Sequence, residues 1–124
     1  MPQEEQRPSL IVAHGDAAYA AQVGRTFRRL GWDVHQTNSG PEVRRLARQV
    51  QPRFILLDAL LPNESGWLTC DKLRLEMPDV RVILVAVDPG FHEANFAVFV
   101  GAAGLVNRAE GMQALRDEIE AVVV

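Results

Sequence analysis

Three polar segments follow apolar runs of the sequence, at places where a strand would end. They are residues 14–16 (His-Gly-Asp), Asp58, and residues 107–108 (Asn-Arg). A carboxylate such as Asp58 has two uses at such a place, because it can bind a hard cation such as magnesium or pair with a positive side chain. His14 and Arg108 are the two potential cationic partners of Asp58. Either use requires that the fold bring the three segments together.

The elements that would position these segments alternate along the chain. Apolar runs predict strands over residues 9–12, 54–57, 80–87 and 105–106, and alternation of apolar and polar residues predicts an edge strand over 32–36. Apolar residues at helical spacing predict a helix after each strand, and the first three helices end at Gly31, Pro52 and Pro78. This alternation predicts an α/β fold, a doubly wound five-stranded parallel sheet in a three-layer sandwich. In such sheets chemistry gathers beyond the carboxyl ends of the strands, near the point where strand order reverses.

Length and composition indicate one ordinary globular domain. The chain has 124 residues, of which 48% are apolar, and a net charge of −3. We expect residues 1–8 to form an N-terminal tail and residues 9–123 to form a single domain. The lone Cys70 excludes an internal disulfide, and its core-facing helical position predicts a buried, unreactive thiol. Since no apolar run reaches about 18 residues and the N-terminus does not read as a secretory signal, we expect a cytoplasmic protein that does not bind membranes.

Residues 58–66, DALLPNESG, carry the most specific motif in the chain. This stretch resembles the phosphoacceptor segment of receiver domains of two-component response regulators, in which a strand ends at an aspartate that is followed by Leu or Met, then Pro, then Gly. Gly31, Gly40 and residues 101–104 (GAAG) match the family at further positions. The resemblance covers about residues 9–122, and it implies a CheY-like, flavodoxin-like (βα)5 fold and a role in bacterial signal transduction.

The resemblance also implies an active site, of which this chain keeps only the acceptor, Asp58. The family's acidic pair at the end of the first strand helps hold a magnesium ion, and its two places fall on His14 and Gly15. The family's switch hydroxyl at the end of the fourth strand falls on Ala86, and its lysine at the end of the fifth strand falls on Arg108. The resemblance therefore implies a pseudo-receiver, with a degenerate phosphorylation site.

These replacements weaken the expected magnesium site. A carboxylate that attacks a phosphoryl donor brings like charges together, so a cation must neutralise the charge that develops. Asp58, the backbone carbonyl of Leu60 and, if its loop turns inward, Asp16 still offer part of a magnesium shell. The imidazole of His14 suits zinc or copper better than magnesium, and Arg108 is not a neutral exchange for lysine. We expect no cofactor, with weak Mg²⁺ binding as the alternative.

Two functional hypotheses follow from the degenerate site. The leading one is a signalling and protein-interaction module that is not an enzyme and acts without phosphorylation, with Asp58 held by Arg108 or His14. For His14 itself we expect an ordinary hydrogen bond rather than metal binding. The rival is a working phosphoacceptor that receives a phosphoryl group on Asp58 from a histidine kinase. A flavodoxin-type small-molecule binder finds no support, because residues 14–20 (HGDAAYA) are not a phosphate-cradling glycine loop.

The segment 91–101, FHEANFAVFVG, carries apolar residues around most of a helical circumference. By position in the family, Ala97 and Val100 should face the sheet, and Phe96 and Phe99 should lie toward the outer surface. We interpret Phe96 and Phe99 as part of a contact surface for a protein partner. The alternative is that the helix is rotated locally or that a neighbouring loop buries these rings. The family often uses the surface made by this helix, the last strand and the last helix for dimerisation or docking. The expected partners are therefore other signalling proteins or a second copy of the chain.

Arginines gather in two expected helices without predicting a nucleic-acid site. Those in the helix before Gly31 are Arg25, Arg28 and Arg29, and those in the next helix are Arg44, Arg45 and Arg48. The predicted topology places these two helices on opposite faces of the sheet, and the net charge is −3. We therefore expect no direct binding to nucleic acid.

Overall fold

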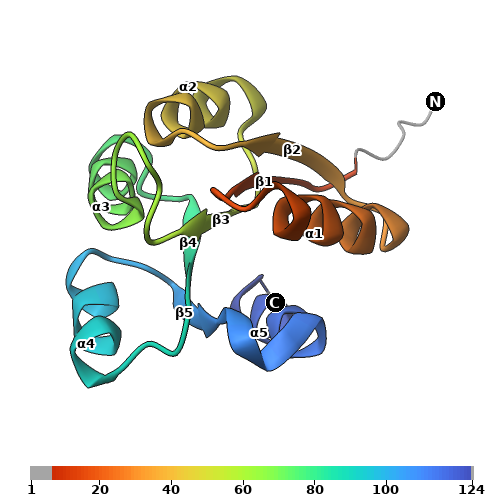
Figure 1. The fold of residues 1–124 in the computed structure, drawn as a ribbon. Helices are drawn as coiled ribbons and strands as arrows, with labels where there is room; N and C mark the ends of the chain where they lie inside the picture. Colours follow the sequence, from red (N-terminus) through yellow and green to blue (C-terminus); the bar gives the residue numbers. More distant parts are fainter. Residues whose placement is uncertain (1–6, 124) are drawn as a thin grey trace.

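The computed structural model describes residues 7–123. Five strands form one parallel sheet in the order β2-β1-β3-β4-β5 (Figure 1). They are β1 (Ser9–Ala13), β2 (Asp33–Thr37), β3 (Phe54–Asp58), β4 (Arg81–Ala86) and β5 (Gly104–Asn107). The predicted sheet is confirmed, and β2 lies at an edge as expected. Residues 1–6 of the predicted N-terminal tail lie outside the described part of the chain.

A helix follows each strand. The helices are α1 (Ala17–Arg29), α2 (Gly40–Val50), α3 (Gly66–Glu76), α4 (Phe91–Phe99) and α5 (Gly111–Val123). The helix predicted over residues 91–101 ends earlier, at Phe99, because Gly101 has a φ of +84°, outside the helical region. A 3-10 turn, η1 (Arg108–Glu110), precedes α5 and was not predicted. Across residues 7–123, no helix combines the length and the apolar character needed to span a membrane.

Helices cover both faces of the sheet (Figure 1). Helices α1 and α5 cover one face, over a core that includes Leu10, Val12 and Ile119. Helices α2, α3 and α4 cover the other, over a core that includes Ile11 and Leu73. Neighbouring residues of β1 therefore point into different cores, which is the period of two that strand geometry imposes. The three-layer sandwich is confirmed, and α1 and α2, which carry the arginines, lie on opposite faces as predicted.

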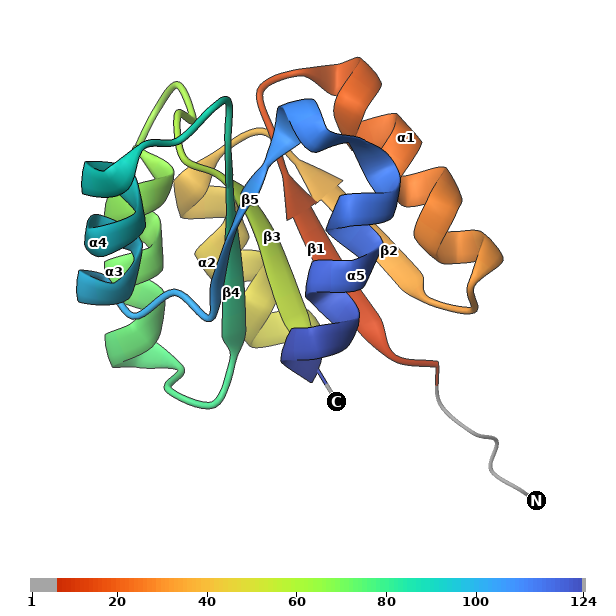
Figure 2. The same cartoon turned by 90° about the horizontal axis from the view of Figure 1, so that it is seen from below.

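The carboxyl ends of the strands meet at one edge of the sheet, at the top of Figure 2. The chain passes from β1 to β2 on one side and then to β3 on the other side of β1, so the strand order reverses between β1 and β3. The loops that follow β1, β3 and β4, and the start of η1 after β5, gather at this edge. The three polar segments of the sequence are thereby brought together, as the alternation of elements predicted.

Gly66 lets the loop after β3 fold back against the end of its own strand. A Cβ atom at this position would lie 2.1 Å from the carbonyl oxygen of Asp58 and 2.9 Å from the Cα of Ala59. The Gly66 N–H donates to the carbonyl of Ala59 at 3.0 Å, and Ser65 caps α3 by accepting from the N–H of Leu68 at 3.2 Å. The glycine of DALLPNESG is therefore a steric requirement, because a side chain there would separate α3 from the strand that ends at Asp58.

Candidate functional site

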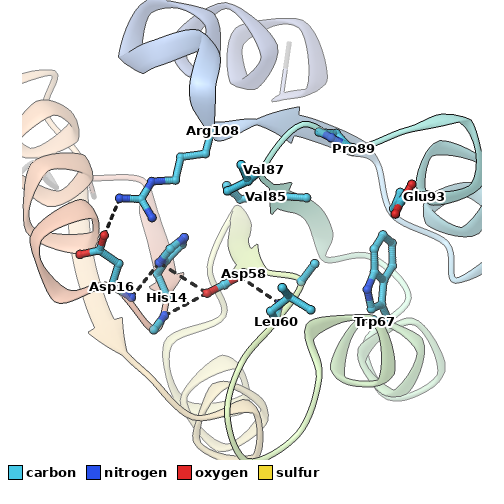
Figure 3. A pocket seen from close by; sticks show the side chains of 13 residues that line it. His14, Asp16, Asp58, Leu60, Trp67, Val85, Val87, Pro89, Glu93 and Arg108 are labelled. Atoms are coloured by element: carbon cyan, nitrogen blue, oxygen red, sulfur yellow. Dashed lines mark hydrogen bonds and ion pairs between the residues drawn. The ribbon is translucent and has the colours of Figure 1, made fainter.

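Asp58 stands at the end of β3, and backbone groups of two loops hold its carboxylate (Figure 3). Its Oδ1 accepts from the N–H of Leu60 at 2.9 Å, and its Oδ2 accepts from the N–H of Gly15 at 3.1 Å. The Asp58 side chain is 15% exposed, so it reaches solvent only through the pocket that it lines. Each carboxylate oxygen keeps further lone pairs for a ligand. Asp58 is therefore fixed in place yet available for binding.

His14 is buried beside Asp58, and it is neutral. Its Nδ1 accepts a hydrogen bond from the N–H of Asp16 at 3.0 Å, so this nitrogen carries no proton. Burial lowers the pKa of His14 below its ordinary value, and Arg108 lowers this pKa further, against the opposing charges of Asp58 and Asp16. The Nδ1 of His14 lies 3.5 Å from Oδ2 of Asp58, but without a proton between the two atoms this contact is no salt bridge. His14 accepts a hydrogen bond and does not neutralise Asp58.

Arg108 pairs with Asp16 rather than with Asp58. Its Nη2 donates to Oδ2 of Asp16 at 2.5 Å, and its guanidinium lies 4.5 Å from the centroid of the Tyr19 ring. Among residues 7–123, no ion pair joins Arg108 to Asp58. Arg108 was one of the two predicted partners of Asp58, with His14 as the other, and for Arg108 the prediction is wrong. The physical reason is that Asp16 and Tyr19, at the start of α1, together offer this cation a carboxylate and an aromatic face.

Asp16 also serves as the N-cap of α1. Its Oδ1 accepts from the N–H groups of Ala18 and Tyr19 at 2.9 Å and 3.2 Å. The hydrogen bond from Arg108 is the main cause of a lowered pKa at Asp16, and the N–H of Tyr19 adds to it. Both oxygens of Asp16 therefore have protein partners, one from the helix start and one from Arg108. The inward turn that magnesium binding would require of Asp16 is absent from this arrangement.

The residues at this edge do not fit a magnesium ion. Magnesium requires hard oxygen ligands in nearly octahedral geometry. Of the places implied by the family, His14 offers a nitrogen, Gly15 offers no side chain, and Asp16 is committed to α1 and Arg108. Nowhere in residues 7–123 do three or more His, Cys, Asp or Glu side chains form a group suited to a metal ion. Of the four residues compared as implied ligands, His14, Gly15, Asp16 and Asp58, only Asp58 thus offers a carboxylate that is not committed to a helix cap or an arginine.

Ala86 ends β4, and the loop after it is tied to β5. Ala86 lines the pocket and carries no hydroxyl that could contact a phosphoryl group. The Asp88 N–H donates to Oδ1 of Asn107 at 2.9 Å, and Nδ2 of Asn107 donates to Oδ1 of Asp88 at 3.2 Å. Asp88 adopts a left-handed φ of 45°, which aspartate tolerates better than most residues. This pair of hydrogen bonds fixes the β4–α4 loop, and no pattern in the sequence predicted it.

A pocket of about 370 Å³ opens beside Asp58 and Ala86 (Figure 3). Its walls are largely apolar and come from the end of β4, the loops after β3 and β4, and the start of α3, through Val85, Leu60, Val87, Pro89 and Trp67. Glu93 of α4 stands on the same side as Trp67, across the pocket from His14 and Arg108. In the sequence, Trp67 is recognisable only as one of the apolar residues at helical spacing after Gly66, and the Leu60 side chain carries no signal of a role. Helical spacing shows that Trp67 shares a face with Cys70, but it does not show the void in front of the indole.

The side of the β3–α3 loop away from the pocket is held by Glu64, whose side chain is only 10% exposed. Its carboxylate accepts from Oγ1 of Thr69 at 2.6 Å, from Nζ of Lys72 at 2.9 Å and from Nη1 of Arg44 at 3.1 Å. Burial raises the pKa of Glu64, but the hydrogen bonds from Thr69 and Lys72 and the charge of Arg44 outweigh burial and lower the pKa below its ordinary value. Ionised Glu64 therefore tethers the loop to α2 and α3.

The aromatic residues of α4 lie as predicted. Ala97 and Val100 are buried against the sheet, whereas Phe96 and Phe99 are 44% and 73% exposed. This burial pattern contradicts the alternative of a rotated helix. The Phe96 ring lies 5.1 Å from that of Trp67 and stacks on that of Phe99 at 5.9 Å, centroid to centroid. We call Trp67, Phe96 and Phe99 the aromatic cluster; it joins α4 to α3.

Comparison with known proteins identifies the type of domain. The family model of the response regulator receiver domain matches residues 10–120. The chain is 31% identical over 80 residues to the DNA-binding dual master transcriptional regulator RpaA of Synechocystis, covering 63% of this chain and 33% of that protein. It is 30% identical over 100 residues to the probable transcriptional regulatory protein TcrX of Mycobacterium tuberculosis, covering 81% of this chain and 43% of that protein. The chain thus spans less than half the length of these curated relatives.

Solved structures share the fold at low sequence identity. The Vibrio cholerae chemotaxis protein CheY4 superposes with a TM-score of 0.88 at 15% identity, covering 94% of this chain and 99% of that one. A response regulator protein from Burkholderia pseudomallei, described with a phosphorylated aspartic acid, a calcium ion and citrate, superposes with a TM-score of 0.81 at 24% identity. That match covers 94% of this chain and 66% of the other. The predicted CheY-like, flavodoxin-like fold is therefore confirmed.

Proposed function

This chain belongs to the family of response regulator receiver domains of two-component signalling, and from that premise we propose that it acts through protein contacts, without phosphorylation of Asp58. RpaA and TcrX, which it resembles in sequence, are transcriptional regulators by description. For this chain we infer a signalling role rather than an enzymatic one. Its kinase, its output partner and the activity of any longer protein that contains it are parts of this proposal.

The observation that carries the proposal is that, within residues 7–123, no positively charged side chain pairs with Asp58. Phosphoryl transfer to a carboxylate needs a cation that bridges the donor and the acceptor. Arg108 is paired with Asp16, His14 is neutral and accepts a hydrogen bond, and Ala86 has no hydroxyl. Repulsion between Asp58 and an incoming phosphoryl group would therefore remain uncompensated.

A working phosphoacceptor is the second candidate, and one observation favours it. Asp58 lines an open pocket with spare lone pairs on both oxygens, so a phosphoryl donor has physical access to it. The Burkholderia pseudomallei relative, which shares the fold, is described with a phosphorylated aspartic acid. In this candidate a histidine kinase donates the phosphoryl group, and Arg108 leaves Asp16 to contact it.

We infer that the output contact is made by the aromatic cluster. Phe96 and Phe99 present stacked rings at the surface, and contiguous exposed apolar area commonly marks a protein interface. Because Phe96 packs on Trp67 of α3, the proposed contact centres on α3 and α4 rather than on the α4–β5–α5 surface of the first expectation. The proposed partners are other signalling proteins or a second copy of the chain. Direct binding to nucleic acid is not part of the proposal, because the arginines of α1 and α2 face opposite ways.

A magnesium titration followed by ¹⁵N–¹H NMR tests the proposed loss of the phosphorylation site. The N–H groups of Gly15 and Leu60 donate to Asp58, so their signals report on any ion that binds this carboxylate. We expect no saturable shift of either signal at millimolar magnesium. Saturable shifts at both positions, abolished in Asp58→Asn, would contradict the proposal.

A double variant, His14→Asp with Gly15→Asp, is the matched positive control for that titration. A Cβ at Gly15 would lie 3.6 Å from Oδ2 of Asp58, which is an ordinary contact, so the side chain can be accommodated. The two added carboxylates restore the oxygen ligands that magnesium prefers. We expect magnesium-dependent shifts at Leu60 in this variant under the conditions in which the natural sequence shows none.

A further inference from the structure

The pocket beside Asp58 has the size and the lining of a small-molecule site. Its volume of about 370 Å³ lies within the range of about 300–1,000 Å³ that ligand pockets usually occupy. The walls are formed by the end of β4, the loops after β4 and β3, and the start of α3, through Val85, Val87, Leu60 and Trp67 respectively. Ala86 contributes only a methyl group, so nothing from the end of β4 fills the space. A ligand with an apolar body would cover these walls and release water from them.

The charged residues around the pocket determine which polar group the ligand should carry besides its apolar body. Asp58 and Glu93 both line it, and the guanidinium of Arg108 is balanced by its pair with Asp16. His14 supplies no positive charge in its neutral form. Oε1 of Glu93 accepts from the N–H of Gly90 at 2.9 Å, which leaves its charge unpaired. The pocket therefore combines apolar walls with an excess of negative charge and favours a cation over an anion.

The positions of Asp58 and Trp67 in the pocket indicate how the ligand would lie. Asp58 is 15% exposed and is held in one orientation by two backbone N–H groups, so it can bind a cation without a large loss of side-chain entropy. The Trp67 indole lies on the far side, next to Leu60 and Glu93 (Figure 3). Indole also attracts cations and packs well on aromatic rings. A molecule with an ammonium group at Asp58 and an aromatic or branched body toward Trp67 satisfies both ends.

We propose that the pocket lined by Asp58, Ala86 and Trp67 binds a small organic cation, an aromatic or branched aliphatic amine. This site shares Trp67 with the aromatic cluster, but it does not require the contact proposed for Phe96 and Phe99. It differs from a nucleotide site, since the ligand carries positive charge and no phosphate. Binding there would place a small molecule against the loops after β3 and β4, which lead into the two helices of the aromatic cluster.

Fluorine NMR of the 5-fluorotryptophan-labelled chain tests the proposal, with 2-phenylethylammonium as the probe. The chain has two tryptophans. Trp67 lines the pocket, whereas Trp32 is partly buried outside it, packs on Phe27 and Phe54 against the core under α1, and serves as an internal reference. We expect a saturable shift of the Trp67 signal and none of the Trp32 signal. Absence of a saturable Trp67 shift up to the solubility limit of the probe would overturn the proposal.

Matched probes and variants test the two ends of the ligand separately. The neutral 2-phenylethanol should bind about tenfold more weakly or worse, which is the usual effect of a lost hydrogen bond to a charged group. Asp58→Asn should weaken the ammonium probe by a similar factor, while Asp79→Asn, which removes an exposed acid at the opposite edge, should not. Ala86→Leu fills the pocket and should abolish the Trp67 shift while leaving the Trp32 signal in place. Equal binding of amine and alcohol, or unchanged binding in Asp58→Asn, would contradict the assignment.

Discussion

The Nδ1 of His14 lies 3.5 Å from Oδ2 of Asp58, yet the proton that would join them is absent because Nδ1 accepts from the N–H of Asp16 at 3.0 Å. This relationship leaves Asp58 in contact with a neutral imidazole. It also makes the pKa of His14 a direct report on the charges at the site, because Asp58 raises this pKa and Arg108 lowers it.

Two substitutions should therefore move the pKa of His14 in opposite directions. Asp58→Asn removes a charge that favours the protonated imidazole, so the pKa of His14 should fall further. Arg108→Gln removes a charge that opposes protonation, so the pKa of His14 should rise. NMR titration of the imidazole measures both values. Shifts of the same sign in the two variants would show that the charges do not act on His14 as the geometry requires.

The same burial should make stability depend on pH through His14. The folded pKa lies below the unfolded value of about 6.5, so the unfolded chain takes up the proton first as the pH falls. This contribution to the free energy of unfolding is complete above about pH 6.5 and is lost as the pH falls toward the folded pKa. Urea unfolding of the natural sequence and of His14→Asn across this range checks it, and the variant should show a flatter profile. Identical profiles would contradict the assignment to His14.

The carboxylate of Glu64 should also make stability depend on pH, in a lower pH range than His14 does. Its folded pKa is depressed, so its contribution is complete above the unfolded value of about 4.3 and is lost as the pH falls through the folded value. Glu64→Gln leaves Arg44 and Lys72 without their shared partner and should cost about 1–2 kcal/mol at neutral pH. Urea unfolding measures this loss. Glu120→Gln, at an exposed position of α5, is the control, and an equal loss in both variants would contradict the role of Glu64.

Substitution of Phe99 should separate binding from folding. Its side chain is 73% exposed, so Phe99→Ser should change the free energy of unfolding by less than about 0.5 kcal/mol. If a second copy uses the aromatic cluster, the natural chain should sediment faster as its concentration rises, and the variant should not. Phe91→Ser, equally exposed at the start of α4 and outside the aromatic cluster, is the control. Identical sedimentation of the natural chain and Phe99→Ser would exclude the aromatic cluster as a self-association surface.

Cys70 should react with thiol reagents only after unfolding. Its side chain is fully buried, and burial raises the pKa of its thiol to about 12. A thiol with so high a pKa holds almost no thiolate at neutral pH, and the thiolate is the reactive form. Labelling by a chromogenic disulfide reagent should therefore follow the unfolding curve in urea. Stoichiometric labelling of the folded chain would contradict the burial of Cys70.

Most of the fold could be predicted from the sequence, since every strand but the alternating edge strand β2 is rich in consecutive apolar residues, and glycine or proline marks the ends of the first three helices. The outward placement of Phe96 and Phe99 was implied by the resemblance to receiver domains, because apolar residues surround most of α4 and spacing alone leaves its buried face open. Periodicity reports which side of an element a residue occupies, and the prediction of the strands and helices required no more than that.

The partners within the site could not be predicted, because they depend on distances between loops. Asp58 was expected to pair with Arg108 or His14, but Arg108 reaches Asp16, and only the folded structure reveals which carboxylate is nearer. One local signal was available, since an aspartate directly before a helix commonly caps it, and a capping Asp16 is already committed to α1. The pocket in front of Trp67 is a void between three elements, and no pattern within a single element reports a void.

The most direct test of the central claim is the intact mass of the chain after incubation with acetyl phosphate and magnesium, beside Asp58→Asn and an ordinary receiver domain treated in parallel. We expect no change in mass for this chain under conditions that modify the ordinary receiver, because no cation is paired with Asp58. A gain of about 80 Da, the mass of one phosphoryl group, that is absent from Asp58→Asn would contradict the claim and make Asp58 a working phosphoacceptor.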